Sequence, residues 1–131
     1  MEMRVAIVGC GLIGHKRARA LGSHRLVAVA DVNPARAGQL AAQYPGCEVC
    51  ATWPEAVARQ DVDAVLVATT NDALAPVTHA AVQQGKHVLV EKPAARSAAE
   101  LAPVADAARR AGTVVKVGFN HRFHPAFLKT R

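Results

Sequence analysis

The chain has 131 residues, of which 51% are hydrophobic and only 4% aromatic, and its formal net charge at pH 7 is +6. This length fits one compact domain, and no run of about 18 apolar residues is present that would cross a membrane. Residues 1–106 hold ten Lys or Arg and ten Asp or Glu, whereas the last 25 residues hold six basic residues and no acid. Because the excess charge is confined to one end, the composition argues against a nucleic-acid partner. The sequence also begins without a basic, apolar leader, so we expect a cytoplasmic protein.

Apolar runs of strand length alternate with helical stretches along the whole chain, which is the pattern of βαβ units. Most of these runs are apolar with little alternation, as expected for strands covered on both faces. The sequence therefore predicts an α/β domain with a doubly wound, mainly parallel six-stranded sheet and helices on both faces. The expected strands are Arg4–Val8, Leu26–Asp31, Glu48–Cys50, Ala64–Ala68, His87–Glu91 and Val114–Gly118.

Capping residues mark several helix boundaries. Asn33 before Pro34 predicts an N-cap and a first helical residue after the second strand. Two pairs predict capping boxes, in which a hydroxyl and a carboxylate bond backbone N–H groups of the first turn: Thr52 with Glu55, and Ser97 with Glu100. The clearest helix is expected over 98–111. Glycines stand where three of the helices should end: Gly22, Gly85 and Gly112.

The three cysteines, Cys10, Cys47 and Cys50, are too few and too irregularly spaced for a disulfide framework. Cys47 and Cys50 form a C-x-x-C pair, but they lead into a strand. A redox pair needs a helix N-terminus to lower its thiol pKa. No second Cys or His pair stands nearby to complete a zinc site. We expect a structural role for these cysteines and no metal site.

The glycine-rich turn after the first strand carries the main functional motif. Gly9, Gly11 and Gly14 form G-x-G-x-x-G between a strand and a helix, and Asp31 follows 22 residues after Gly9 at the end of the next strand. Such glycines allow a tight turn, close approach of a pyrophosphate and close helix packing, while the helix N-terminus attracts phosphates. The simpler alternative is an ordinary strand–helix turn with an incidental aspartate. Together the features favour a Rossmann-type dinucleotide site with these contacts: Gly9, Gly11, Leu12, Ile13, Gly14, Asp31 and Val32.

Asp31 also indicates which dinucleotide is bound. A carboxylate at the end of the second strand accepts hydrogen bonds from ribose hydroxyls and repels a 2′-phosphate. The sequence therefore predicts NAD rather than NADP. Arg36, on the following helix, is the residue that could reach a 2′-phosphate instead.

Two later segments, GKHVLVEKP (Gly85–Pro93) and VGFNHRFHPA (Val117–Ala126), add a more specific pattern. With the glycine loop they resemble the N-terminal half of the glucose-fructose oxidoreductase / inositol dehydrogenase family (Gfo/Idh/MocA), over essentially the whole chain. In that family a dinucleotide-binding domain precedes an α/β substrate domain. The resemblance implies that residues 1–118 form the NAD(P)-binding Rossmann domain. It also implies that residues 119–131 begin the connection to a C-terminal substrate domain absent from this chain.

The same resemblance assigns the residues at the nicotinamide end. It implies that Lys92 is the catalytic lysine, which hydrogen-bonds the reacting hydroxyl or carbonyl of the substrate. It implies that Glu91 and the backbone of Lys92 contact the nicotinamide ribose. Further cofactor contacts implied in this way are Thr69, Asn71 and Asn120.

The sequence departs from the family pattern after the fourth strand. Thr70 stands where the family usually has proline, and Leu74 stands where it usually has histidine. These two differences leave the subfamily and the substrate open.

The resemblance implies an NAD-dependent oxidoreductase that transfers hydride between nicotinamide and a hydroxyl or carbonyl of a sugar, cyclitol or related polyol. It also implies a homo-oligomer in the full-length form. The alternative is a non-catalytic dinucleotide-binding regulator or scaffold of the same fold, against which the retained Glu91-Lys92-Pro93 argues. By itself this chain is expected to bind the nucleotide and turn over little, because the substrate wall and partner base would lie in the second domain.

Overall fold

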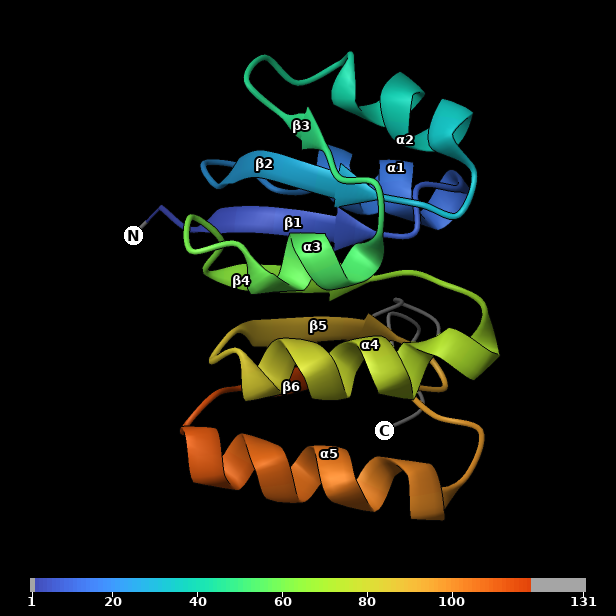
Figure 1. Ribbon diagram of the computed structural model, residues 1–131, viewed down its shortest axis with the longest axis vertical. Coiled ribbons are helices and arrows are strands. Elements are labelled where there is room, and N and C mark those ends of the chain that lie inside the picture. Colours follow the sequence, from blue (N-terminus) through green and yellow to red (C-terminus); the bar gives the residue numbers. More distant parts are fainter. Residues whose placement is uncertain (1, 119–131) are drawn as a thin grey trace, which may run out of the picture.

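The computed structural model describes residues 2–118, so Asn120 and the expected connection at 119–131 lie outside the described residues. Within that range strands and helices alternate strictly (Figure 1). The strands are β1 (Arg4–Val8), β2 (Arg25–Ala30), β3 (Glu48–Val49), β4 (Ala64–Val67), β5 (His87–Glu91) and β6 (Val115–Gly118). The helices are α1 (Leu12–Arg19), α2 (Pro34–Ala41), α3 (Trp53–Ala58), α4 (Asn71–Gln83) and α5 (Ala98–Ala111).

The strands form a single described sheet in the order β3-β2-β1-β4-β5-β6, and every pairing within it is parallel. Figure 1 shows this order from top to bottom, with α3 and α4 in front of the sheet. The chain winds outward from β1 to β3 and then returns to β4 beside β1. This reversal of direction is the point where doubly wound sheets open a crevice at the carboxyl ends of their strands. The expected fold class is confirmed.

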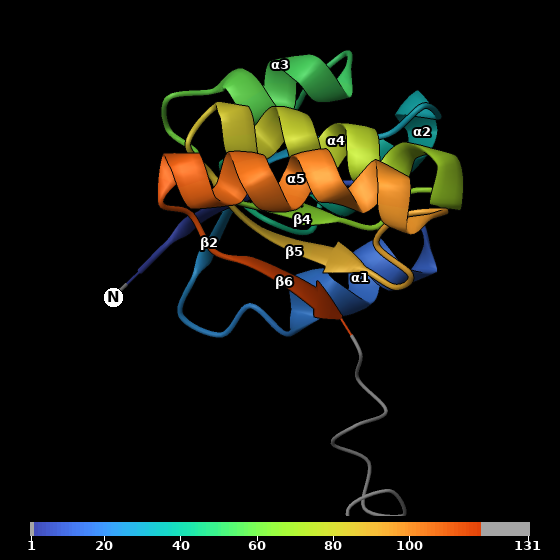
Figure 2. The same cartoon turned by 90° about the horizontal axis from the view of Figure 1, so that it is seen from below.

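Helices cover both faces of the sheet because successive strand residues point to opposite sides. On one face Ile7 of β1 packs with Leu40 of α2, and α1 joins the same cluster through Ala18. On the other face Val67 of β4 packs with Leu74 of α4, and α3 and α5 complete that layer. Figure 2 shows α3, α4 and α5 on one side of β4, β5 and β6, with α1 on the other. These two apolar clusters hold the helices against the sheet, at whose carboxyl edge the crevice lies.

The strand boundaries differ from the expected ones by about one residue. Asp31 and Cys50 lie just beyond the ends of β2 and β3, and Ala68 lies just beyond β4. Cys50 and Ala68 still donate one backbone hydrogen bond each to the neighbouring strand, at 2.8 Å. The backbone ladders therefore continue one residue past the ends of β3 and β4.

The N-caps of α2 and α3 differ in their agreement with prediction. Asn33 caps α2 as expected, because its side-chain oxygen accepts the N–H of Ala35 at 3.0 Å. The capping box predicted at Thr52 is wrong. Thr52 makes no side-chain cap bond among the described residues, and Glu55 accepts the N–H of Ala51 at 3.2 Å. The carboxylate reaches one residue beyond the predicted partner.

Of the two hydrogen bonds predicted for the capping box of α5, one is present. The Ser97 hydroxyl accepts the N–H of Glu100 at 3.3 Å, as predicted. The Glu100 carboxylate bonds the N–H of Arg96 at 2.8 Å rather than that of Ser97, because the Arg96 guanidinium holds it there at 2.6 Å. At the other end Gly112 adopts a left-handed C-cap with φ 69°, which confirms the predicted stop.

Burial governs the chemistry of the cysteines. It raises the pKa of the Cys10 thiol to about 12 and that of Cys47 to about 11, and it also raises the pKa of Cys50. All three thiols are free. These shifts are opposite to those of a reactive redox pair, which supports the structural role. Within residues 2–118 there is no cluster of ligands suited to a metal ion, and no helix is long and apolar enough to span a bilayer.

Candidate functional site

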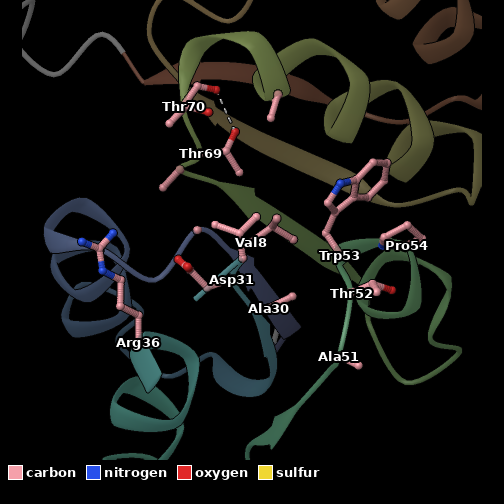
Figure 3. A pocket seen from close by; sticks show the side chains of 15 residues that line it. Val8, Ala30, Asp31, Arg36, Ala51, Thr52, Trp53, Pro54, Thr69 and Thr70 are labelled. Atoms are coloured by element: carbon pink, nitrogen blue, oxygen red, sulfur yellow. Dashed lines mark hydrogen bonds between the residues drawn. The ribbon is translucent and has the colours of Figure 1, made fainter. Parts of the chain in front are cut away.

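A cleft of about 630 Å³ opens at the carboxyl ends of β1, β2 and β4, where the strand order reverses (Figure 3). Its size lies within the range of about 300–1,000 Å³ that is typical of small-ligand and cofactor sites. The glycine loop after β1 forms its floor, together with the segments that follow β2 and β4. The predicted motif and the observed cleft therefore coincide.

Two glycines of the loop are required by close backbone contacts. Gly9 has φ +98°, and a Cβ there would lie 2.9 Å from the nitrogen of Thr69 and would also run into the carbonyl of Ala68. A Cβ at Gly14 would meet the carbonyl oxygen of Gly9. Gly9 thus allows the segments that follow β1 and β4 to lie in direct backbone contact, and Gly14 allows α1 to pack closely against the glycine loop.

Gly11 has a different role. A Cβ added at this position meets no described atom within 4 Å, so its space belongs to the cleft. Gly11 is also the N-cap of α1 and brings no side-chain oxygen to the first N–H groups of the helix. These donors and the positive end of the helix dipole are therefore left to attract an anion. Leu12 and Ile13 occupy the first turn with 81% and 41% of their surfaces exposed, outside the cleft lining.

The carboxylate of Asp31 ties the loop to the next helix. One oxygen accepts the N–H of Cys10 at 2.7 Å, and the other accepts the N–H of Asn33 at 2.7 Å. Because an ionised carboxylate has about four acceptor positions, these two bonds leave capacity for two hydroxyl groups of a ligand. Asp31 lines the cleft together with Val32 and Arg36, and Figure 3 shows the guanidinium on the same side as the carboxylate.

The opposite wall was not anticipated from the sequence. Trp53 and Pro54, at the start of α3, line the cleft on the side away from Arg36 (Figure 3). Sequence reasoning treated this segment only as a helix start. The available signal was the position of the chain's single tryptophan, four residues after the third strand. The indole and the proline ring give the cleft an apolar wall opposite its charged one.

The segment after β4 contributes only in part. Thr69 lines the cleft, and its hydroxyl donates to the carbonyl of Thr70 at 3.1 Å. Asn71 begins α4, is exposed and stands outside the cleft lining. Leu74 is fully buried in the core under α4. The position where histidine was expected is therefore a packing position in this chain.

The end of β5 lies at the same sheet edge, because β5 runs parallel to β4. Glu91 forms a two-pronged ion pair with Arg17 of α1, at 2.6 and 2.9 Å. Lys92 follows it with an exposed side chain, and the Lys92–Pro93 peptide bond is cis. Neither Glu91 nor Lys92 lines the 630 Å³ cleft.

Comparison with known proteins identifies the fold's relatives. The model of the Gfo/Idh/MocA family, described as "Oxidoreductase family, NAD-binding Rossmann fold", matches residues 3–119. The chain belongs to this family. It is 35% identical to inositol 2-dehydrogenase 2 of Saccharopolyspora erythraea, over 100% of this chain and 40% of the relative. It is 40% identical to myo-inositol dehydrogenase Hyg17 of Streptomyces leeuwenhoekii, over 98% of this chain and 40% of the relative.

A solved structure of the family gives the same result at the level of shape. GenD2 from gentamicin A biosynthesis, in complex with NAD, superposes with a TM-score of 0.90 at 32% identity. The match covers 98% of this chain and 37% of that one. The chain thus spans about 40% of the length of the curated relatives it matches, and it corresponds to their NAD-binding Rossmann domain.

In this Gfo/Idh/MocA domain the predicted residues divide into two groups. The cleft brings together Gly9, Gly11, Asp31, Val32 and Thr69. A second group lies beside the cleft without lining it: Leu12, Ile13, Gly14, Asn71, Glu91 and Lys92. Asn120 lies outside the described residues. Arg17 was missed altogether, since nothing in the sequence connects it with a residue 74 positions away.

Proposed function

We propose that this domain binds NAD in the 630 Å³ cleft, in preference to NADP, and that the protein is an NAD-dependent dehydrogenase. Its substrate would be a sugar, a cyclitol or a related polyol, oxidised at a hydroxyl group or reduced at the matching carbonyl. The observation that carries the proposal is Asp31, whose carboxylate stands in the cleft and directly bonds the glycine loop. Relatives named as inositol dehydrogenases, each matched over their NAD-binding part, support the substrate class.

The residues present fit a dinucleotide on structural grounds. The space beside Gly11 would be filled by a side chain at that position, and the uncapped first turn of α1 offers N–H donors toward it. Gly11 and these donors would hold the pyrophosphate, and Asp31 would hold the adenosine ribose through its free acceptor positions. The apolar wall of Trp53 and Pro54 would face the adenine. When bound, the nicotinamide supplies the site that accepts or donates hydride.

The chain's own contribution to the reaction would come from Lys92. As an ammonium group at the carboxyl edge of the sheet, it would donate a hydrogen bond to the reacting oxygen of the substrate. It would thereby stabilise negative charge that develops on that oxygen as the hydroxyl proton passes to a base supplied by the substrate domain. Thr69, at the mouth of the cleft, would position the cofactor on the side facing Lys92.

The proposal is tested on the protein expressed from its complete reading frame. Calorimetry should show NAD bound more tightly than NADP, and Lys92→Ala should retain NAD binding while reducing turnover of a cyclitol by about 100-fold or more. Lys116→Ala, an exposed lysine of β6, is the matched control and should leave both unchanged. Turnover that survives Lys92→Ala would contradict the catalytic assignment. Tight NAD binding with no turnover of any polyol would instead favour the non-catalytic regulator.

Four further expectations belong to the same proposal. Residues 1–118 would be the dinucleotide-binding domain and 119–131 the start of a connection to a substrate domain. The protein would be a homo-oligomer, would reside in the cytoplasm and would not bind nucleic acid. The free, high-pKa thiols are compatible with a reducing compartment. Sedimentation of the complete protein tests the oligomer, and a strict monomer at high concentration would contradict it.

A further inference from the structure

The ion pair between Arg17 and Glu91 joins two parts of the site that are distant in sequence. The guanidinium Nε lies 2.6 Å from one carboxylate oxygen of Glu91, and Nη2 lies 2.9 Å from the other. Only 15% of each side chain is exposed. A fork of this kind fixes both the distance and the orientation of the two groups, which a single-point contact does not.

The last residue of β6 leaves room for the pair. Gly118 lies opposite Glu91 in the β5–β6 register. A Cβ added there would stand 3.1 Å from Oε2 of Glu91 and 3.2 Å from Nη2 of Arg17, closer than such contacts normally are. The pair therefore sits at a junction of α1, β5 and β6, and a side chain at Gly118 would require it to shift by a few tenths of an ångström. Figure 2 shows α1 beside the ends of these two strands.

Glu91 also holds the turn that carries Lys92. Its carbonyl oxygen accepts the N–H of Ala94 at 3.0 Å and so closes the turn over Lys92 and Pro93. Ala94 has φ 72° and is buried, so the turn is anchored at its far end as well. Arg17 holds the side chain of Glu91, and the backbone of Glu91 leads directly into Lys92. The position of Lys92 is thus tied to the helix whose N-terminus forms the phosphate end of the cleft.

We propose that Arg17 is a positioning residue that acts through Glu91 to hold Lys92 in place relative to the glycine loop. This inference rests on the proposed function, because it assigns Arg17 a part in the reaction attributed to Lys92. It differs from a purely structural role in one respect. Removal of Arg17 should harm the reaction only as long as Lys92 is there to be positioned.

The experiment compares five variants, one of them a control, of the protein expressed from its complete reading frame. Arg17→Met removes the fork, and Arg17→Lys keeps the charge at a single point. Lys92→Ala is examined alone and combined with Arg17→Met. Arg4→Met is the matched control, since it removes another two-pronged pair, with Asp63 at 3.1 and 2.9 Å, at the opposite edge of the sheet.

Arg17→Met should reduce kcat by about 10- to 100-fold, as expected for a reacting group misplaced by a fraction of its working distance. Arg17→Lys should recover part of this loss. In the Lys92→Ala background, Arg17→Met should cause no further loss, and Arg4→Met should leave kcat unchanged. An equal loss with and without Lys92 would overturn the inference, and so would an unchanged kcat in Arg17→Met.

Two readouts do not depend on activity. Hydrogen exchange at the Ala94 amide should become faster in Arg17→Met and remain unchanged in Arg4→Met, and equal exchange in both variants would overturn the inference. ADP-ribose, which lacks the nicotinamide ring, should bind wild type and Arg17→Met with affinities within about threefold, because the phosphate end of the cleft is intact. A larger loss of affinity would place the effect at the glycine loop and overturn the inference.

If Arg17→Met does not fold, Gly118→Ala crowds the same ion pair and should give a smaller loss of kcat, whereas an unchanged kcat would contradict the inference.

The two proposals fail in different ways. An unaffected reaction in Lys92→Ala refutes the proposed function, whatever Arg17 does. A reaction that requires Lys92 and does not require Arg17 refutes the inference alone.

Discussion

Replacing Asp31 by asparagine separates its two roles, as a brace of the glycine loop and as a reader of the ribose. The carboxylate accepts one backbone N–H on each oxygen, both at 2.7 Å. Asparagine keeps the shape of the side chain but offers one oxygen and one NH2 group, so one of the two backbone donors must face another donor. Asp31→Asn therefore loses one of the two hydrogen bonds by necessity, whichever way the amide turns, and the bond that remains is no longer charge-assisted.

The cost follows from which bond is lost. A hydrogen bond to a charged group contributes about 1.5–3 kcal/mol, and the larger values apply where water cannot replace the partner. The bond to Cys10 is partly buried, whereas the bond to Asn33 is exposed. The amide will therefore turn its NH2 group toward Asn33, where water can take over. We expect the free energy of unfolding to fall by about 1.5 kcal/mol, at the low end of that range.

The effect on the cofactor is read from a ratio of affinities. Any loosening of the glycine loop weakens NAD and NADP alike, whereas loss of the negative charge favours only the nucleotide with a 2′-phosphate. With solvent screening, that charge is expected to contribute about 1.4 kcal/mol, or roughly tenfold, to the preference for NAD. Urea denaturation measures the first effect, and calorimetry with NAD and NADP measures the second. Asp106→Asn, on the exposed side of α5, serves as the control. An NAD-to-NADP ratio that stays within twofold of wild type would refute the role given to Asp31.

Four other outcomes are expected. Gly11→Ala should keep its melting temperature, because its Cβ meets no described atom, and should lower NAD affinity by about tenfold or more in calorimetry by entering the phosphate space. Gly14→Ala should lower the free energy of unfolding by about 1–3 kcal/mol in urea, since α1 must move off the loop. Lys86→Met leaves two carbonyls, bonded at 2.6 and 2.7 Å, without their donor, and should cost about 1–3 kcal/mol by the same assay. Finally, Arg4 lowers the pKa of Asp63 from 3.8 to about 2. The stability that this ion pair contributes is complete above about pH 4 and is lost as the pH falls toward 2. Arg4→Met should therefore weaken the dependence of the urea midpoint on pH between about pH 5 and pH 2.5. A pH dependence equal to that of wild type in this range would contradict the prediction.

The sequence predicted the sheet well because its signal is local. Runs such as Ala64–Val67 and His87–Glu91 are short and mostly apolar, and each places valines in the buried core. The errors at Asp31 and Ala68 are of one residue, at the ends of β2 and β4. Where a strand ends depends on its pairing in the assembled sheet.

Competing local contacts and contacts between distant residues set the limit of the sequence analysis. The Glu100 carboxylate goes to Arg96 because a guanidinium competes for it, and the capping-box rule does not include that competitor. The relation of Trp53 to the cleft and of Arg17 to Glu91 arises only when separate elements meet. Sequence motifs located the glycine loop, Asp31 and Lys92. The position of Lys92 beside the cleft, outside its lining, follows only from the packing of the folded chain.

The two ends of the strands separate stability from recognition. Arg4, Asp63 and Lys86 stand where β1, β4 and β5 begin, and the cleft opens where the strands finish. A strand of five residues is roughly 16 Å long, about twice the distance over which physiological salt screens a surface charge. Salt therefore screens the charges at the starting edge of the sheet from a dinucleotide bound at the carboxyl edge. Substitutions at the starting edge can therefore be used to raise heat or acid tolerance while the cofactor preference stays constant.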